Sequence, residues 1–159
     1  MSSAYVDGYK ENFLWSLGML EKFIKVCPEE VWKGKHGGFL VGQEAYHILA
    51  VIDFFIDGIN EPGVHELFSA DFKYLLEELP HPPAQGDIAD LCPLMKERAL
   101  NFFNSLSDET LLHKHAGLSQ RIGADTNYSK TAFLLGSHIL YHLGNLDGAL
   151  RDAGLKGVW

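Results

Sequence analysis

The chain has 159 residues and a formal net charge of −8 with its histidines neutral, and 47% of its residues are hydrophobic. This length suffices for one domain with a sizeable core, and we expect a single domain over residues 1–159. The acidic balance, without any run of Lys and Arg, argues against nucleic acid and against anionic membranes as partners. Because no apolar run could cross a bilayer and no secretory signal is recognisable, the sequence predicts a cytoplasmic protein.

Apolar residues spaced three or four apart predict four long amphipathic helices. These cover residues 3–26, 41–59, 87–106 and 129–154. The pattern therefore predicts an all-α fold, a four-helix bundle with a long connection between the second and third helices. Functional sites in such bundles are commonly built from inward-facing residues of neighbouring helices.

The ends of these helices carry recognisable signals. Ser2 or Ser3 is expected to cap the first helix, and Asp87 the third. Pro93 fits the third helix only if its long part begins near residue 91, which would place the proline in a first turn. Gly154 is a good stop signal for the last helix.

The connecting segments are predicted as follows. Residues 33–38, KGKHGG, are predicted to form a loop, because their glycines interrupt regular secondary structure. Residues 64–86 suggest a short helix followed by a proline-rich connection. Residues 113–127 lack a sustained period and are expected to form a loop with at most a short extended piece. Because loops over a rigid bundle usually set specificity, we expect the last two segments to do so.

Three histidines fall on stripes that should face the core. His138 and His142 stand four residues apart on the last helix, so their rings share one face, and His47 lies on the inward stripe of the second helix. Two ligands at this spacing and a third from a neighbouring helix suit Zn, Ni, Cu or Fe and leave positions open for water or substrate. One ion would satisfy three imidazoles whose burial is otherwise costly.

The alternative is a set of ordinary hydrogen-bonded core histidines, since a chain with eight histidines readily contains a chance H-x-x-x-H pair. The pair lacks the glutamate of H-E-x-x-H, which disfavours a protease. Glu44 lies one turn before His47 and is the candidate residue to orient a metal ligand or to accept a proton. The alternative is that Glu44 is an ordinary, partly exposed helix carboxylate. Tyr141 and Asn145 flank the pair, and Asn145 either reaches the site or packs in a second polar layer.

The other five histidines fall in predicted loops or helix ends and are expected at the surface. They are His36, His65, His81, His113 and His115. Cys27 and Cys92 lack a C-x-x-C spacing and are expected as free thiols. Because neither lies near the predicted site, an external thiol is a better candidate nucleophile than an internal one.

The last helix resembles the C-terminal signature of the DinB-like family, the DinB/YfiT superfamily. That signature has H-x-x-x-H, a polar residue three positions on, a leucine–arginine pair and a closing glycine. In this sequence the matching positions are His138, His142, Asn145, Leu150, Arg151 and Gly154. The family's other histidine lies early in its second helix, where EAYHIL supplies His47. Asn145 departs from the glutamine common at its position.

The resemblance implies a divalent ion, zinc or nickel most often, held by the three histidines, and a homodimer. Some relatives are thiol-dependent transferases or isomerases that use low-molecular-weight thiols such as bacillithiol or mycothiol, and others are described as metal-dependent hydrolases. We therefore expect a metal-dependent enzyme in which His47, His138 and His142 hold an ion that activates a thiol or water toward a small-molecule substrate. The alternative is a non-catalytic, stress-related binding module on the same bundle.

Overall fold

The computed structural model describes residues 3–56 and 75–159, and this part of the chain is mostly helical. The long helices are α1 (Ala4–Val26), α3 (Val41–Ile56), α5 (Gln85–Asn104) and α7 (Tyr128–Asp152). The shorter elements are α2 (Glu29–Trp32), α6 (Ala116–Ile122), the 3₁₀ helix η2 (Thr110–Leu112), and the strands β1 (Lys35–His36) and β2 (Phe39–Leu40). The predicted all-α class is found, with a small hairpin added to it.

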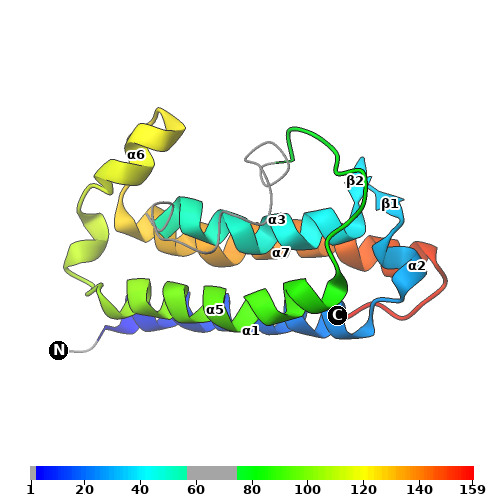
Figure 1. Cartoon of the computed structure of the whole chain (residues 1–159). Coiled ribbons are helices and arrows are strands. Elements are labelled where there is room, and N and C mark those ends of the chain that lie inside the picture. Colours follow the sequence, from blue (N-terminus) through cyan, green and yellow to red (C-terminus); the bar gives the residue numbers. More distant parts are fainter. Residues whose placement is uncertain (1–2, 57–74) are drawn as a thin grey trace.

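The four long helices lie side by side (Figure 1), and both α5 and α7 pack against α1 and α3. Apolar side chains from all four fill the space between them, and each such burial contributes about 1.5–3 kcal/mol. Fully buried examples are Phe13, Phe23, Ile48, Met95, Phe103, Ile139 and Leu143. Among the described helices, none combines the length and apolarity that crossing a membrane requires.

Helix α3 is the most enclosed element, since every residue from Val41 to Asp53 is buried. A helix that is apolar around its whole circumference is expected in such a position. Its few polar side chains therefore require partners. Asp53 accepts a hydrogen bond from Arg98 Nε of α5 at 2.7 Å, and Gln43 bonds the backbone of the segment that precedes α5. Glu44 and His47 are two further buried polar side chains of α3.

The start of α1 differs from the prediction. Ser3 occupies the cap position, but its side chain makes no capping hydrogen bond there. The carboxylate of Asp108 instead accepts the backbone N–H of Val6 at 3.1 Å and that of Tyr5 at 3.3 Å. Ser2, the other predicted cap, lies outside the described residues. A partner distant in sequence thus satisfies the free N–H groups of the first turn.

Helix α5 also begins earlier than predicted. It starts at Gln85, with Ala84 in the cap position, so Asp87 lies in the first turn and is not the cap. Pro93 lies in the interior of the helix, and the prediction that it would occupy a first turn is wrong. A proline there removes one hydrogen bond. Burial of Met95 and Cys92 on either side of Pro93 stabilises the helix through its packing.

Helix α7 begins and ends within two residues of the predicted bounds, 129–154. The side chain of Asn127 accepts the N–H of Lys130 at 2.9 Å and caps its start. At its end Gly154 has a φ of +75°, and the N–H of Leu155 bonds the carbonyl of Leu150 at 2.9 Å. This pattern is the Schellman motif, which favours glycine because of the left-handed backbone conformation.

Two connections are more ordered than predicted. Residues 35–40 form the β1–β2 hairpin, and residues 113–127 contain α6 together with a single β-bridge between Lys114 and Asn127. The short extended piece was expected, whereas the helix was not. The predicted short helix within residues 64–86 and the end of the second helix, residues 57–59, fall largely or wholly outside the described residues. Residues 75–84 form no regular element.

Candidate metal centre

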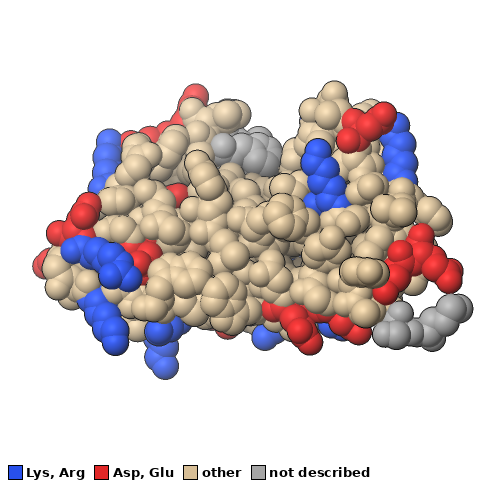
Figure 2. Space-filling model, turned by 180° about the vertical axis from the view of Figure 1, so that it is seen from behind, with Lys and Arg blue, Asp and Glu red and all other residues tan. Residues whose placement is uncertain are grey.

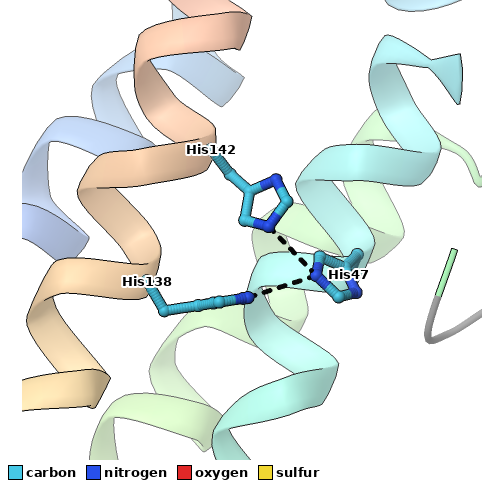
Figure 3. Close-up of side chains that lie close together, drawn as sticks. All are labelled: His47, His138 and His142. Atoms are coloured by element: carbon cyan, nitrogen blue, oxygen red, sulfur yellow. Dashed lines mark hydrogen bonds between the residues drawn. The ribbon is translucent and has the colours of Figure 1, made fainter. Parts of the chain in front are cut away.

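The structure brings the three predicted histidines together between α3 and α7 (Figure 3). The Nε2 atom of His47 lies 3.2 Å from Nε2 of His138 and 3.2 Å from Nε2 of His142. Their candidate ligand atoms all lie within 4.8 Å of one another. His47 is buried, and the two histidines of α7 are half-buried. Three ring nitrogens therefore converge from two packed helices.

The orientation of α7 explains why its two histidines lie at the edge of the core. The fully buried stripe of this helix runs through Leu135, Ile139 and Leu143. His138 and His142 each precede one residue of that stripe, so they are rotated by about 100° from it toward α3. The sequence placed the histidines on the stripe itself, whereas they border it. This position leaves one side of each imidazole accessible.

Hydrogen bonds among the three Nε2 atoms cannot all form at full strength at the same time. A neutral imidazole nitrogen carries either one hydrogen or one lone pair. If His142 carries its hydrogen on Nδ1, its Nε2 offers a lone pair to His47. The single Nε2 of His47 cannot then form a full hydrogen bond with both neighbours. A cation at the point of convergence would accept all three lone pairs.

The spacing of the nitrogens fits this interpretation. Zinc binds imidazole nitrogen at about 2.0–2.1 Å, so two ligands at a tetrahedral angle are about 3.3–3.4 Å apart. The two separations of 3.2 Å from His47 Nε2 are close to that value. Imidazole ligands are also shared by nickel, copper and iron sites. The donor set therefore fits a divalent transition-metal ion without selecting one element.

His138 is held in its neutral form. Burial, followed by the electrostatic effect of the neighbouring His47 and then of His142, lowers the pKa of His138 to about 3. The ring of Phe55 meets His138 edge to face, at 5.4 Å between centroids, and contributes an apolar wall. A neutral imidazole keeps the lone pair that a metal requires.

Glu44 lies directly behind the site. Its Oε1 accepts a hydrogen bond from Nδ1 of His142 at 2.7 Å, and its Oε2 accepts one from Nδ2 of Asn145 at 2.5 Å. Only 5% of Glu44 is exposed, which contradicts the alternative of a partly exposed helix carboxylate. A carboxylate on the far nitrogen of a histidine fixes its tautomer and directs its other nitrogen. Of the roles considered for Glu44, orienting a ligand is the one that this geometry supports.

The two residues that flank the pair have separate positions. Asn145 donates hydrogen bonds to Glu44 and to the carbonyl oxygen of His36. Among the described residues, none of its hydrogen bonds goes to a histidine ring. It therefore packs in the second polar layer behind the site. Tyr141 is exposed, and its ring meets that of His142 edge to face at 5.0 Å.

The remaining histidines follow the surface prediction with one clear exception. His81 and His113 are exposed, His36 is half-buried, and His65 lies outside the described residues. His115 is only 1% exposed, so its predicted surface position is wrong. It stacks on Tyr128 and Phe102, and its Nδ1 lies 2.7 Å from Oγ1 of Thr131. No local sequence signal distinguishes His115 from an exposed loop histidine, because its burial depends on the packing of α6 and α7.

Cys27 and Cys92 are free and buried, as expected for structural thiols. Burial raises the pKa of Cys27 to about 11. Burial and the nearby charge of Glu21 raise the pKa of Cys92 to about 12. Since the thiolate is the reactive form, neither thiol is activated as a nucleophile.

Comparison of the chain with models of protein families, with curated proteins and with solved structures gives no match in any of the three. The chemistry of the site is therefore inferred from the donor atoms of its side chains. Three imidazoles, one of them backed by a carboxylate, bring their ring nitrogens close enough together to hold a metal ion. Three protein ligands would leave further positions of an ion open, whereas closed structural zinc sites use four protein ligands.

Proposed function

We propose that this protein is a DinB-like four-helix bundle that binds one divalent ion, zinc or nickel, through His47, His138 and His142, and that it is a metal-dependent enzyme. The observation that carries the proposal is the convergence of three Nε2 atoms, two of them 3.2 Å from the third. The carboxylate of Glu44 on Nδ1 of His142 supports it further. The packing of four long helices and the Schellman ending at Gly154 agree with the family resemblance.

An ion bound by three uncharged ligands supplies Lewis acidity, which can lower the pKa of bound water to about 7 or stabilise a thiolate. The chain's own residues orient and isolate the site. Glu44 keeps the hydrogen of His142 on Nδ1, and Phe55 borders His138 with apolar surface. The reacting substrate is a small electrophile that reaches the accessible side of the two α7 histidines.

The nucleophile comes from outside the chain, because Cys27 and Cys92 are buried with raised pKa values. Glu44, the candidate base, has both carboxylate oxygens engaged by His142 and Asn145. Activation of water usually needs a free base, whereas a thiol ionises near pH 8.5 and needs less assistance. We therefore favour transfer to an external low-molecular-weight thiol, such as bacillithiol or mycothiol, over hydrolysis.

Metal content tests the site directly. The untagged protein is purified and its metals are measured by inductively coupled plasma mass spectrometry, alongside His47→Ala and His138→Ala. The exposed His113→Ala is the matched control. We expect one ion per chain in the parent and the control, and loss in both site variants. A folded parent without metal, whose melting temperature does not respond to Zn or Ni, contradicts the proposal.

Activity is tested on the metal-loaded protein with two substrate panels. One combines low-molecular-weight thiols with electrophiles, and the other contains esters and amides. Turnover of the first panel that His138→Ala abolishes supports thiol transfer, and turnover of the second supports hydrolysis. Metal binding without turnover in either panel favours the non-catalytic binding module.

We also propose that two copies of the chain associate, as the family resemblance implies. Figure 2 shows a face whose middle is largely free of charged side chains, with Lys, Arg, Asp and Glu gathered around its edges. Exposed aromatic residues lie on α1 and α7, among them Trp15, Phe133 and Tyr141. Light scattering coupled to size exclusion should give twice the 17.8 kDa of one chain. A monomeric mass at micromolar concentration contradicts this proposal.

A further inference from the structure

The β1–β2 hairpin lies against α7 at Asn145, about one turn beyond His142, and both residues of its turn have positive φ. Residues 35 and 40 pair, as do residues 36 and 39, so Gly37 and Gly38 form a two-residue turn. Their φ values are +62° and +104°. Positive φ at both central positions is characteristic of tight hairpin turns, and glycine adopts it without strain.

Gly37 is in close contact with Asn145 of α7. A β-carbon at residue 37 would lie 2.6 Å from Nδ2 of Asn145 and 2.7 Å from its Oδ1, closer than atoms can approach. The hairpin backbone therefore fits directly over the amide group of Asn145. One turn further along α7, Gly148 leaves room for the His36 ring, because a β-carbon there would lie 3.0 Å from its Nε2.

The amide of Asn145 connects the hairpin to Glu44. Its Nδ2 donates to Oε2 of Glu44 at 2.5 Å and to the carbonyl oxygen of His36 at 3.4 Å. A carboxylate oxygen and a carbonyl oxygen both accept, so the NH₂ side of the amide must face them. Both of its hydrogens are used, one toward the hairpin and one toward the carboxylate.

A continuous series of contacts thus runs from the hairpin to the third histidine. The backbone of His36 and Gly37 holds Asn145, Asn145 holds one oxygen of Glu44, and the other oxygen of Glu44 holds Nδ1 of His142. Every contact in this series is made on the side of His142 opposite to the converging Nε2 atoms. Outer hydrogen-bond partners of this kind tune the affinity of a metal site.

We infer that Asn145, held by the β1–β2 hairpin, is a positioning residue that fixes the tautomer and orientation of His142 through Glu44. The expected effect of Asn145 on zinc affinity rests on the proposed metal site. The tautomer of His142 does not, because it is a property of the metal-free protein. Without the amide, the carboxylate of Glu44 loses one of its two anchors and can rotate. His142 then samples both tautomers and presents Nε2 less often in the productive form.

The test compares Asn145→Leu, which keeps the approximate size of the side chain without its amide, with Asp152→Asn. The control alters the exposed Asp152, 3.5 Å from His36, and leaves Glu44 untouched. Long-range ¹H–¹⁵N spectra of the metal-free proteins report the tautomer of His142, and chelator competition reports zinc affinity. We expect N145L to give a mixture of tautomers and a dissociation constant about 10–100-fold higher, with D152N unchanged in both.

Gly37→Ala is the second variant, because its β-carbon would collide with the amide of Asn145 while the sequence of α7 stays unchanged. It should shift the tautomer of His142 in the same direction as N145L. Circular dichroism confirms that each variant is folded. An unchanged tautomer and unchanged zinc affinity in both folded variants overturn the inference while leaving the metal site intact. A parent that binds no zinc refutes the proposed function instead, and the metal-free spectra still decide the role of Asn145.

Discussion

Glu44 Oε1 lies 2.7 Å from Nδ1 of His142, across the interface between α3 and α7. This contact joins the most enclosed helix of the protein to the helix that carries two of the three converging histidines. It is the arrangement by which a carboxylate raises the basicity of a ligating imidazole. Removing the charge of Glu44 should therefore weaken metal binding without removing a ligand.

We predict that Glu44→Gln lowers zinc affinity by about 10–100-fold and leaves one ion bound at saturation. The glutamine amide brings an N–H group toward either His142 or Asn145, both of which already donate. Chelator competition measures the affinity, and Glu11→Gln on the exposed face of α1 is the matched control. An affinity equal to that of the parent would show that the carboxylate does not act on His142.

Metal binding should also stabilise the fold, because the three histidines are brought together only in the folded chain. At free zinc of 100 times the dissociation constant, the expected gain is about 2.7 kcal/mol. Thermal unfolding followed by circular dichroism should show a rise in melting temperature for the parent. His138→Ala should show almost none. An equal rise in both proteins would place the bound zinc elsewhere.

The two cysteines give a prediction that does not depend on metal. Burial raises the pKa of Cys27 to about 11 and, together with Glu21, that of Cys92 to about 12. At about pH 8 the native protein should therefore react very slowly with a disulfide reagent such as DTNB. In guanidinium chloride both thiols should react at once. Rapid reaction of one thiol in the native state would contradict its burial.

The same shifts predict a loss of stability at alkaline pH. Below their usual pKa of 9.0, both thiols are protonated in the folded and in the unfolded chain, so ionisation does not favour unfolding. As the pH rises from about 9 toward 11–12, the unfolded thiols ionise first, and the free energy of unfolding falls. Urea unfolding at about pH 8 and about pH 10 measures this slope, which should be shallower in Cys92→Ala. A slope that C92A leaves unchanged would contradict the assignment to this thiol.

Local patterns were sufficient to predict the four long helices and the three histidines. Spacing by three or four residues places His138 and His142 on one face of α7 wherever that helix packs. The interior position of Pro93 in α5 could not be predicted in the same way, since packing of its neighbours overrides the local rule. The contact between the β1–β2 hairpin and Asn145 could not be predicted either, because the two lie more than 100 residues apart in sequence.

His115 shows the limit of local patterns most clearly. Its sequence context predicts a surface loop, yet it is 1% exposed and stacks on Tyr128. Its Nδ1 lies 2.7 Å from the hydroxyl of Thr131, which is fully buried. These partners come from another helix, so no pattern within the loop could predict them.

We predict that Thr131→Val destabilises the protein by about 1–3 kcal/mol, because the buried His115 loses this hydrogen bond. The substitution keeps the shape of the side chain, so cavity formation contributes little. Urea unfolding gives the free energy, and Ser137→Ala on α7 is the control for loss of a peripheral hydroxyl. Equal effects of the two substitutions would show that the His115 contact contributes no specific stability.

The cap of α1 provides a matched pair of variants. The carboxylate of Asp108 accepts the N–H groups of Val6 and Tyr5, whereas Ser3 in the cap position makes no side-chain bond. Asp108→Ala should therefore cost about 0.5–2 kcal/mol, the usual loss for a removed helix cap. Ser3→Ala should stay within about 0.5 kcal/mol of the parent, as is typical of surface substitutions.

Asp108→Asn removes the negative charge near the helix N-terminus but keeps one acceptor oxygen, so one of the two N–H groups, which bond to different oxygens of Asp108, retains its partner. The charge is worth about 0.3–1 kcal/mol in such positions and is screened by salt. The difference between D108N and the parent should therefore shrink in high salt, whereas most of the loss in D108A should persist. If Ser3→Ala proved as costly as D108A, the helix would be capped locally, as the sequence alone predicts.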